Sequence, residues 1–261
     1  MFHDILLSSE NKVATISINR PEVSNALAKT TYAEIKNAID QCQRDDGIGC
    51  IVITGKGKNF SAGGDIVRFK ELIDKQIYLQ EEAIDEAAEM SSAIRLCPKP
   101  TIAMINGVAT GAGLSIALAC DFRTGTAKSK LIMAFIKMGL SGDTGSIFFL
   151  NKLLGVARAT ELILTGKPLS GKDAYTFGLL NRLTEEETLV EETCQLAESL
   201  ANAPLYAIRR QKELINTFFY QDLPAFTALE TEAMAACSRT HDFEEAVNAF
   251  LEKRTPHFTG K

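Results

Sequence analysis

Apolar and polar positions divide the chain into short apolar runs and longer segments of helical periodicity. Residues 13–18 alternate apolar and small polar side chains, whereas residues 50–54 and 101–105 are short, mostly apolar runs. These patterns are typical of β-strands, half-buried in the first case and fully buried in the other two. Helical spacing predicts helices at 26–42, at 66–95 with a break near 76–80, and beginning at 114–119.

The last quarter of the chain has a different pattern. Strand signals disappear after about residue 198, and amphipathic helical segments follow at 207–218, 223–237 and 242–254. Short strands alternating with helices predict the α/β class for the preceding part. We therefore expect an α/β core over residues 1–198 and a helical region over residues 199–261.

Composition and charge exclude some classes of protein. With 46% apolar and 23% charged residues among 261, the chain has an ordinary globular composition. Its net charge of −5 argues against a general nucleic-acid binder. Residues 101–120 carry no charge and have roughly the length of a membrane span. Pro100, Asn106 and three glycines interrupt this stretch, which predicts a buried strand, turn and helix and no contact with a membrane.

The six cysteines do not form a recognisable metal motif or disulfide framework. They are widely spaced, and several lie in apolar runs. The first residues are polar and acidic where a secretion signal requires a basic start and a long apolar stretch. We expect reduced, buried thiols, no bound metal and a cytoplasmic location.

Two glycine-rich turns carry the main chemical signal. The first, NFSAGGDI at 59–66, follows the strand at 50–54, and the second, with Gly107, Gly111 and Gly113, follows the strand at 101–105. Amides at the start of a helix have no intrahelical partner and can receive an anionic oxygen. Two facing turns that supply one N–H each would stabilise an oxyanion. This arrangement suits chemistry next to a carbonyl, especially that of a thioester.

These turns belong to a series of ordered motifs that covers nearly the whole chain. The motifs are NRPEVSNAL at 19–27, GKGKNFSAGGDI at 55–66, KPTIAMINGVATGAGLSIALACD at 99–121, LTGKPLSGKDAYTFGLLNRL at 164–183 and FLEKRTPHF at 250–258. In this order they resemble the crotonase family, also called the enoyl-CoA hydratase/isomerase family. The resemblance implies a spiral of strand–strand–helix repeats, with a helical C-terminal region that packs subunits into homotrimers or hexamers. It also implies a substrate carried as a coenzyme A thioester, with no other cofactor.

The resemblance assigns roles to particular residues. The oxyanion donors would be the backbone N–H groups of Gly64 and Ala112. The coenzyme A path would be lined by Val23, Ser24, Ala62, Asp65 and Ile66. Phe250 and Lys253 match tail positions that reach the coenzyme A bound to a neighbouring subunit.

The residues for acid–base chemistry separate the possible reactions. Family hydratases carry two glutamates at positions that are Ser115 and Phe135 in this chain. Neither side chain is a base near neutral pH, so simple hydration is disfavoured. Asp143, in GLSGDTGS at 139–146, is the remaining acid. Its flanking glycines are typical of an exposed turn where an aspartate caps a helix. Family isomerases of the dienoyl-CoA and ring-opened phenylacetyl-CoA types place a catalytic aspartate at this point.

We therefore expect an acyl-CoA isomerase of fatty acid metabolism in which Asp143 shifts a double bond. Burial among apolar neighbours such as Phe135, Ile136 and Leu140 is expected to raise the pKa of this aspartate. A hydratase of an unusual substrate, such as a cyclic dienoyl-CoA, is the alternative, and a non-catalytic thioester-binding protein is a third hypothesis. The motif also resembles aryl-CoA dehalogenases, which need a tryptophan and a histidine base. The chain has no tryptophan, and its three histidines lie near the termini.

Overall fold

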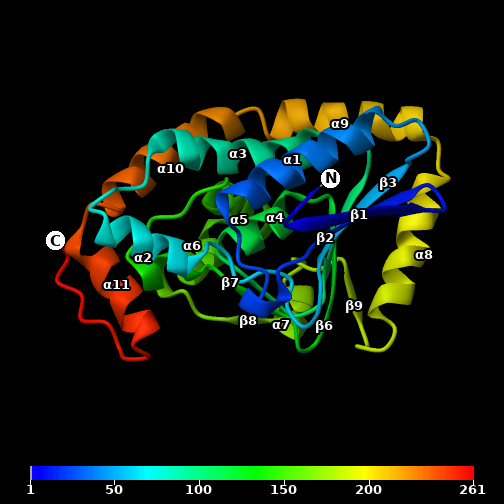
Figure 1. Ribbon diagram of the computed structural model, residues 1–261. Helices are drawn as coiled ribbons and strands as arrows, with labels where there is room; N and C mark the ends of the chain where they lie inside the picture. Colours follow the sequence, from blue (N-terminus) through cyan, green and yellow to red (C-terminus); the bar gives the residue numbers. More distant parts are fainter. Residues whose placement is uncertain (1) are drawn as a thin grey trace.

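Two β-sheets organise the first two thirds of the chain (Figure 1). The computed structural model describes residues 2–261. The larger sheet has the order β1-β2-β3-β4-β6-β9, and the smaller has the order β5-β7-β8. The strands are β1 (Ile5–Glu10), β2 (Val13–Ile18), β3 (Cys50–Gly55), β4 (Thr101–Ile105), β5 (Val108–Thr110), β6 (Phe122–Thr126), β7 (Lys130–Ile132), β8 (Leu169–Ser170) and β9 (Arg182–Thr184).

Helices surround these sheets and form the whole C-terminal part. They are η1 (Pro21–Val23), α1 (Lys29–Arg44), α2 (Ile66–Asp74), α3 (Glu81–Leu96), α4 (Ala112–Ala119), η2 (Ala134–Met138), α5 (Ser146–Leu154), α6 (Val156–Thr165), α7 (Gly171–Thr176), α8 (Leu189–Ala201), α9 (Leu205–Phe219), α10 (Leu223–Cys237) and α11 (His241–Leu251). The break expected near 76–80 is confirmed, because α2 ends at Asp74 and α3 begins at Glu81.

The strands follow a repeated path between the two sheets. β4 joins the larger sheet, β5 joins the smaller one, and α4 follows; β6 and β7 repeat this division before η2. After β3, Ser61 forms a parallel bridge to Ala109 of β5, which gives a third, shorter version of the same unit. Parallel pairing joins β2, β3, β4, β6 and β9 in turn. The α/β spiral expected from the sequence is therefore confirmed.

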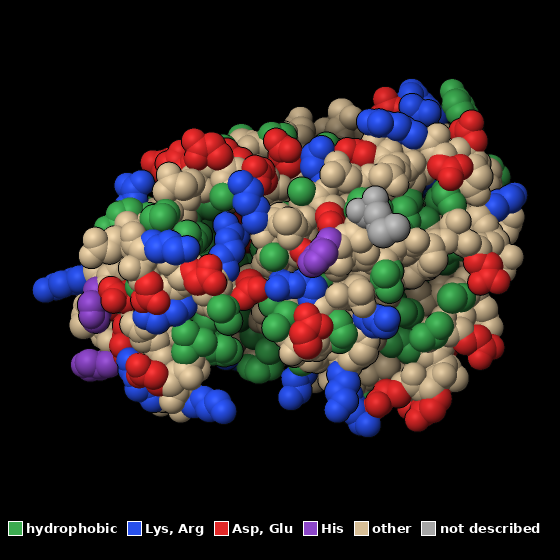
Figure 2. Space-filling model, viewed as in Figure 1, with side chains coloured by type: hydrophobic (Ala, Val, Ile, Leu, Met, Phe, Trp, Pro, Cys, Tyr) green, Lys and Arg blue, Asp and Glu red, His purple; other side chains and the backbone are tan. Residues whose placement is uncertain are grey.

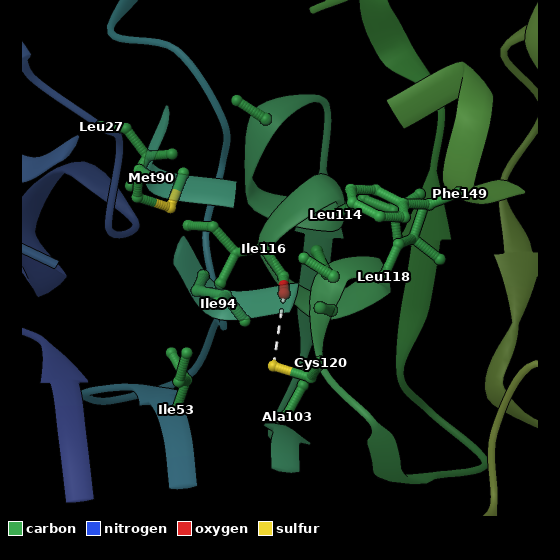
Figure 3. Packing of buried hydrophobic residues seen from close by; sticks show 14 of the residues in the cluster. Leu27, Ile53, Met90, Ile94, Ala103, Leu114, Ile116, Leu118, Cys120 and Phe149 are labelled. Carbon is green, nitrogen blue, oxygen red and sulfur yellow. Dashed lines mark hydrogen bonds between the residues drawn. The ribbon is translucent and has the colours of Figure 1, made fainter. Parts of the chain in front are cut away.

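The uncharged stretch at 101–120 forms the centre of the core. All eight residues of α4 are buried, and the stretch is a buried strand, turn and helix as predicted. Figure 3 shows Leu114 and Leu118 on the side of α4 that faces Phe149, and Ile116 on the side that faces Ile94. A helix that is apolar on all sides must be surrounded by protein. Among residues 2–261 no helix is both long and apolar enough to cross a membrane.

The cysteines only partly match the expectation of buried thiols. All six are free, and four of them are buried, but Cys194 is exposed and Cys237 is only partly buried. Cys120 packs in the core, where its thiol donates to the carbonyl oxygen of Ile116 at 3.4 Å (Figure 3). The cytoplasmic location inferred from these thiols stays a prediction.

The helical C-terminal part is packed onto the α/β core. The boundary expected after residue 198 falls inside α8, whose Ala197 and Ala201 are buried with Val52 of β3 and Ile102 of β4. α9 and α10 run beside α1 and α3 along one edge of the molecule, and α11 lies next to α2 (Figure 1). Figure 2 shows acidic and basic side chains interspersed over the visible face, so neither sign of charge dominates there.

A buried ion cluster ties α9 to the core. Asp121, just after α4, forms ion pairs with Arg95 of α3 and Lys212 of α9. It also accepts hydrogen bonds from the Thr101 N–H (2.8 Å) and hydroxyl (3.0 Å). The Arg95 and Lys212 side chains are only 6% and 7% exposed. Removing one partner from such a cluster leaves an uncompensated buried charge.

The substitution Asp121→Asn is expected to lower the free energy of unfolding by about 3–5 kcal/mol, because two buried cations lose their counter-charge. Urea denaturation monitored by circular dichroism measures this loss. Glu213→Gln is the control, since Glu213 pairs with Arg210 where both side chains are more than half exposed. Its effect should stay below about 1 kcal/mol. Equal losses in the two variants would show that the Asp121 cluster does not anchor α9.

Candidate active site

A large, mostly apolar cavity lies between the spiral and the C-terminal helices. Its volume is about 630 Å³, within the range of small-molecule sites. Its wall is formed by the loop before α2, the turn before α4, η2, Asp143, and parts of α10, α11 and the tail. The cavity therefore joins both glycine turns to the aspartate singled out in the sequence.

The two glycine turns touch through their backbones. The Ser61 N–H donates to the carbonyl oxygen of Val108, and the Thr110 N–H donates to that of Ser61, both at 3.0 Å. A Cβ at Gly63, where φ is +82°, would lie 2.6 Å from the Thr110 carbonyl oxygen, and one at Gly113 would lie 2.6 Å from the Ser61 side chain. Only glycine permits this separation of the two segments.

This contact leaves one amide in each turn without an acceptor. Gly64 forms a parallel bridge with Leu27, in which the flanking residues make the hydrogen bonds: Leu27 N–H donates to Gly63 (2.7 Å), and Asp65 N–H donates to Leu27 (3.3 Å). Ala112 is the first residue of α4, where the N–H has no intrahelical partner. Within residues 2–261 neither the Gly64 nor the Ala112 amide donates to a protein atom. Both residues line the cavity, as the oxyanion hole implied by the resemblance requires.

Asp143 lies on the wall of the same cavity and is 7% exposed. The exposed turn expected from its flanking glycines is wrong. The capping alternative is also wrong, because Gly145 occupies the N-cap position of α5. Among the described residues the Asp143 side chain accepts only from the Thr144 hydroxyl (3.1 Å). Burial raises the pKa of Asp143 to about 6, and the Thr144 hydrogen bond opposes this rise. The expected upward direction is confirmed.

The apolar surroundings of Asp143 differ slightly from those expected. Phe135 and Leu140 line the cavity with Asp143, but Ile136 is 41% exposed and does not reach the wall. Ser115 is fully buried, and its hydroxyl donates to the Gly111 carbonyl oxygen at 3.3 Å. Neither position where a family hydratase carries glutamate therefore places a carboxylate on the wall.

Asp65 is the other acidic residue on the described wall, and its carboxylate is already engaged. It caps α2 by accepting from the Val67 N–H (3.1 Å), and it pairs with Arg20 (3.1 Å). Within the described chain Asp143 has no ion-pair partner. Asp143 is thus the wall carboxylate that is free to act on a bound molecule.

The residues expected to bind coenzyme A are largely brought together. The wall includes Val23, Ala62, Asp65, Ile66 and Phe250. Ser24 lies just behind it, and its carbonyl oxygen accepts from the Ala62 N–H (3.0 Å). Lys253 is exposed and does not reach the wall. Phe250 lies on the cavity of its own chain, where α11 packs next to α2. Its contact with the site of a neighbouring subunit stays a prediction.

Three side chains near the site were missed by the sequence analysis. Tyr32 of α1 and Arg254 of the tail line the cavity, and Glu230 of α10 hydrogen-bonds to the segment that follows Asp143. Tyr32 followed the apolar periodicity of its helix, so that pattern indicated a core residue. Arg254 is paired with Glu245 at 2.8 Å. Among residues 2–261 no group of three or more His, Cys, Asp or Glu side chains is arranged to hold a metal ion.

Comparison with known proteins identifies the family. The family model described as enoyl-CoA hydratase/isomerase matches residues 8–261. The chain belongs to the enoyl-CoA hydratase/isomerase family. Its α/β spiral is therefore the crotonase fold that the sequence motifs indicated, and its cavity is the candidate active site of a member of this family of enzymes.

Relatives in this family carry both isomerase and hydratase names. The chain is 34% identical over 261 residues to trans-2-decenoyl-[acyl-carrier-protein] isomerase of Streptococcus mutans, covering 100% of this chain and 99% of the relative. It is 35% identical over 268 residues to 1,2-epoxyphenylacetyl-CoA isomerase of Escherichia coli, covering 100% of both. A crystal structure of an enoyl-CoA hydratase from Mycobacterium avium subsp. paratuberculosis matches with a TM-score of 0.91 and 27% identity, covering 99% of this chain and 100% of that one.

The buried carboxyl of Asp143 has a consequence for stability. Its folded-state pKa of about 6 lies above the ordinary value near 4, so the folded protein loses stability as pH rises from about 4 through 6. Asp143→Asn is therefore expected to be more stable than the wild type at pH 7.5, by up to about 3 kcal/mol, with the gap closing near pH 4. Urea denaturation at both pH values and equal protein concentration measures the gap.

Asp46→Asn makes the same chemical change at an exposed position and serves as the control. Its effect should stay within about 0.5 kcal/mol at either pH. An Asp143→Asn protein that is less stable than the wild type at pH 7.5 would contradict a costly buried carboxylate at this site.

Proposed function

We propose that the protein is an acyl-CoA isomerase that shifts a double bond in an enoyl-CoA thioester. The observation that carries this proposal is one buried, unpaired carboxylate, Asp143, on the same cavity wall as the free amides of Gly64 and Ala112. A base and an oxyanion hole are the two parts that proton transfer next to a thioester carbonyl requires.

The reaction follows from these two parts. The Asp143 carboxylate takes a proton from the carbon next to the thioester carbonyl of a 3-enoyl group. The electron pair of the broken C–H bond moves into a dienolate, whose oxygen accepts hydrogen bonds from Gly64 and Ala112. Protonated Asp143 then returns the proton to the far end of the dienolate, which leaves a 2-enoyl group. Atoms and charge balance with no water added.

The environment of Asp143 suits this role. A carboxyl with a pKa of about 6 is mostly ionised at neutral pH and is a stronger base than an ordinary aspartate. Phe135 and Leu140 line the cavity with Asp143, and apolar side chains at this position disfavour a bound water and thus competing hydration. The apolar wall also fits the hydrocarbon part of an acyl chain.

The carrier of the acyl group is proposed to be coenzyme A. Val23, Ser24, Ala62, Asp65 and Ile66 lie on or directly behind one part of the wall, which supports the pantetheine path expected from the resemblance. Phe250 contributes to the wall from α11, and Lys253 stays a proposed phosphate contact. The name of the S. mutans relative includes acyl carrier protein, so each substrate should be tested on both carriers.

Hydration is the second candidate, because a structural relative is named a hydratase. That reaction needs one carboxyl to activate water and another to deliver a proton. Here Ser115 and Phe135 replace the two glutamates, and the remaining wall acid besides Asp143 is held by Arg20. A thioester-binding protein without catalysis is the third candidate. It gives no reason for a buried carboxylate without a counter-charge.

The deciding experiment incubates the protein with 2-enoyl and 3-enoyl thioesters and measures product mass. Isomerisation leaves the mass unchanged, whereas hydration adds one water. The rate constant kcat/KM should rise with pH through about 6 as Asp143 ionises. Asp143→Asn should lower turnover by roughly 10²–10⁴-fold while coenzyme A binding changes little. A hydrated product, or an Asp143→Asn protein with wild-type turnover, would refute the proposed mechanism.

The oxyanion hole is tested separately at Gly64. Gly64→Pro removes the N–H donor, and turnover should fall by about 10²–10³-fold. Gly64→Ala keeps the N–H and is the matched control; its added Cβ would lie 2.8 Å from the ring of Phe69, a side chain that is able to move. The alanine variant should therefore retain much more activity. Equal activities in the two folded variants would argue against a donor at this position.

We also propose that the protein forms homotrimers or pairs of trimers. α9 exposes large apolar side chains, including Tyr206 (78% exposed), Leu214 (70%) and Phe218 (73%), which suit an interface between subunits. Light scattering should give a mass that is a multiple of three chains of 28.4 kDa. A monomer at working concentration would contradict the trimer.

A further inference from the structure

The turn that carries Asp143 has an unfavourable backbone conformation. Positive φ angles occur at Gly142 (+119°), Thr144 (+57°) and Gly145 (+73°). Thr144 is β-branched, and such residues rarely adopt this region of conformational space. A strained segment of this kind persists only where its surroundings determine it, and strain of this kind clusters at functional sites.

One residue from outside the turn holds its backbone. The Gly145 N–H donates to Glu230 Oε2 at 2.6 Å, and the Ile147 N–H donates to Glu230 Oε1 at 3.1 Å. Glu230 lies on α10, about 85 residues further along the chain. Within residues 2–261, every other hydrogen bond to the backbone of 142–147 comes from the turn itself or from α5.

Glu230 is as deeply buried as Asp143, with 5% of its surface exposed. Neither carboxyl forms an ion pair with a lysine, arginine or histidine of the described chain. Burial, together with the charge of Asp143, raises the pKa of Glu230 to about 8. Two neighbouring buried acids that lack a counter-ion are costly for folding. Such pairs are characteristic of functional sites.

The other titratable groups around this pair are few. Tyr32 of α1 lies on the cavity wall within the field of Asp143, whose charge raises the pKa of the phenol in addition to burial. On the α3 side of α10, Asp85 accepts from the hydroxyl of Thr231, the residue next to Glu230 (2.7 Å). Neither group hydrogen-bonds to Glu230, so the amides of Gly145 and Ile147 are its described partners.

We propose that Glu230 is a positioning residue of the active site, which holds the two amides that follow Asp143 and thereby directs the Asp143 carboxylate into the cavity. The proposal rests on the isomerase function proposed for Asp143. A carboxyl group offers two acceptor oxygens, and both are used here. A glutamine would place an NH₂ group against one of the two amides, so it holds only half of this contact.

This positioning role means that a C-terminal helix contributes to the active site of its own subunit. α10 packs along α3, which belongs to the core, and it contributes Met234 to the cavity wall one turn after Glu230. The helix thereby connects the base-bearing turn to the wall that contacts the acyl group.

The test compares Glu230→Gln with Glu232→Gln, which makes the same change at an exposed position on the same helix. A misplacement of about 1 Å in a catalytic group costs about 10²-fold in rate. We expect Glu230→Gln to lower kcat by about that factor with KM little changed. Glu232→Gln should leave both constants unchanged. Glu230→Asp, which keeps the acid but is one methylene shorter, is the second variant if the glutamine protein does not fold.

A second measurement needs no catalytic activity. The gain in the free energy of unfolding caused by Asp143→Asn is measured at a series of pH values. The measurement is made both in the wild-type protein and in the Glu230→Gln variant, which gives a double-mutant cycle at each pH. In the wild type the gain should grow between about pH 4 and pH 6, with its midpoint at about pH 5, halfway between the unfolded and folded pKa values of Asp143. Without Glu230 this midpoint should move towards the ordinary range of a carboxyl group, because the released turn admits water to Asp143.

The two measurements separate the possible failures. An unchanged midpoint, or an unchanged kcat in a folded Glu230→Gln protein, would overturn the positioning role and leave a helix cap only. If the wild type shifts no double bond, the isomerase proposal fails, and the midpoint still decides whether Glu230 controls Asp143.

Discussion

The contact between the 61–64 loop and the 110–113 turn is the constraint on which the site depends. Gly63 and Gly113 allow two backbones to approach where any Cβ would lie 2.6 Å from its neighbour. Hydrogen bonds from Ser61 and Thr110 then fix the two turns together. Because the spiral stacks one repeat on the next, each of the two turns ends with a backbone N–H, that of Gly64 or of Ala112, which has no hydrogen-bond acceptor within the described residues. The proposed oxyanion hole is a product of this stacking.

The C-terminal helices complete what the spiral begins. The spiral supplies two amides and the apolar floor, while α10 and α11 supply Glu230, Met234 and Phe250 from the same chain. Asp121 joins α9 to the core through Lys212, so these helices are anchored to the α/β part by a buried charge cluster. The candidate active site is therefore not confined to the α/β core, because the helical region expected to serve assembly also lines its cavity.

Stabilising and destabilising segments are distributed unevenly over the fold. α4 and its neighbours form a dense apolar core. The turn at 142–147, in contrast, has positive φ angles and lies beside two buried acids, Asp143 and Glu230, which have no ion-pair partner among residues 2–261. Such a segment lowers the free energy of unfolding, and it persists because the surrounding core exceeds that loss. This distribution suits the base proposed at Asp143, since the burial that raises its pKa also destabilises its charged form.

The sequence by itself determined the α/β class, α1 to α4, α9 to α11, the glycine turns and the family, because these depend on local periodicity and on motifs of fixed spacing. It did not predict α6, α7 and α8. It missed short strands such as β7 and β8, whose few residues carry too little alternation, and it placed Asp143 in an exposed turn. Only the tertiary structure decided that this turn is buried, that Phe250 lines the cavity of its own chain and that Glu230 holds the turn. Burial, and contacts such as that of Glu230 with a turn about 85 residues earlier in the chain, arise from tertiary packing. A local pattern of side chains does not predict them.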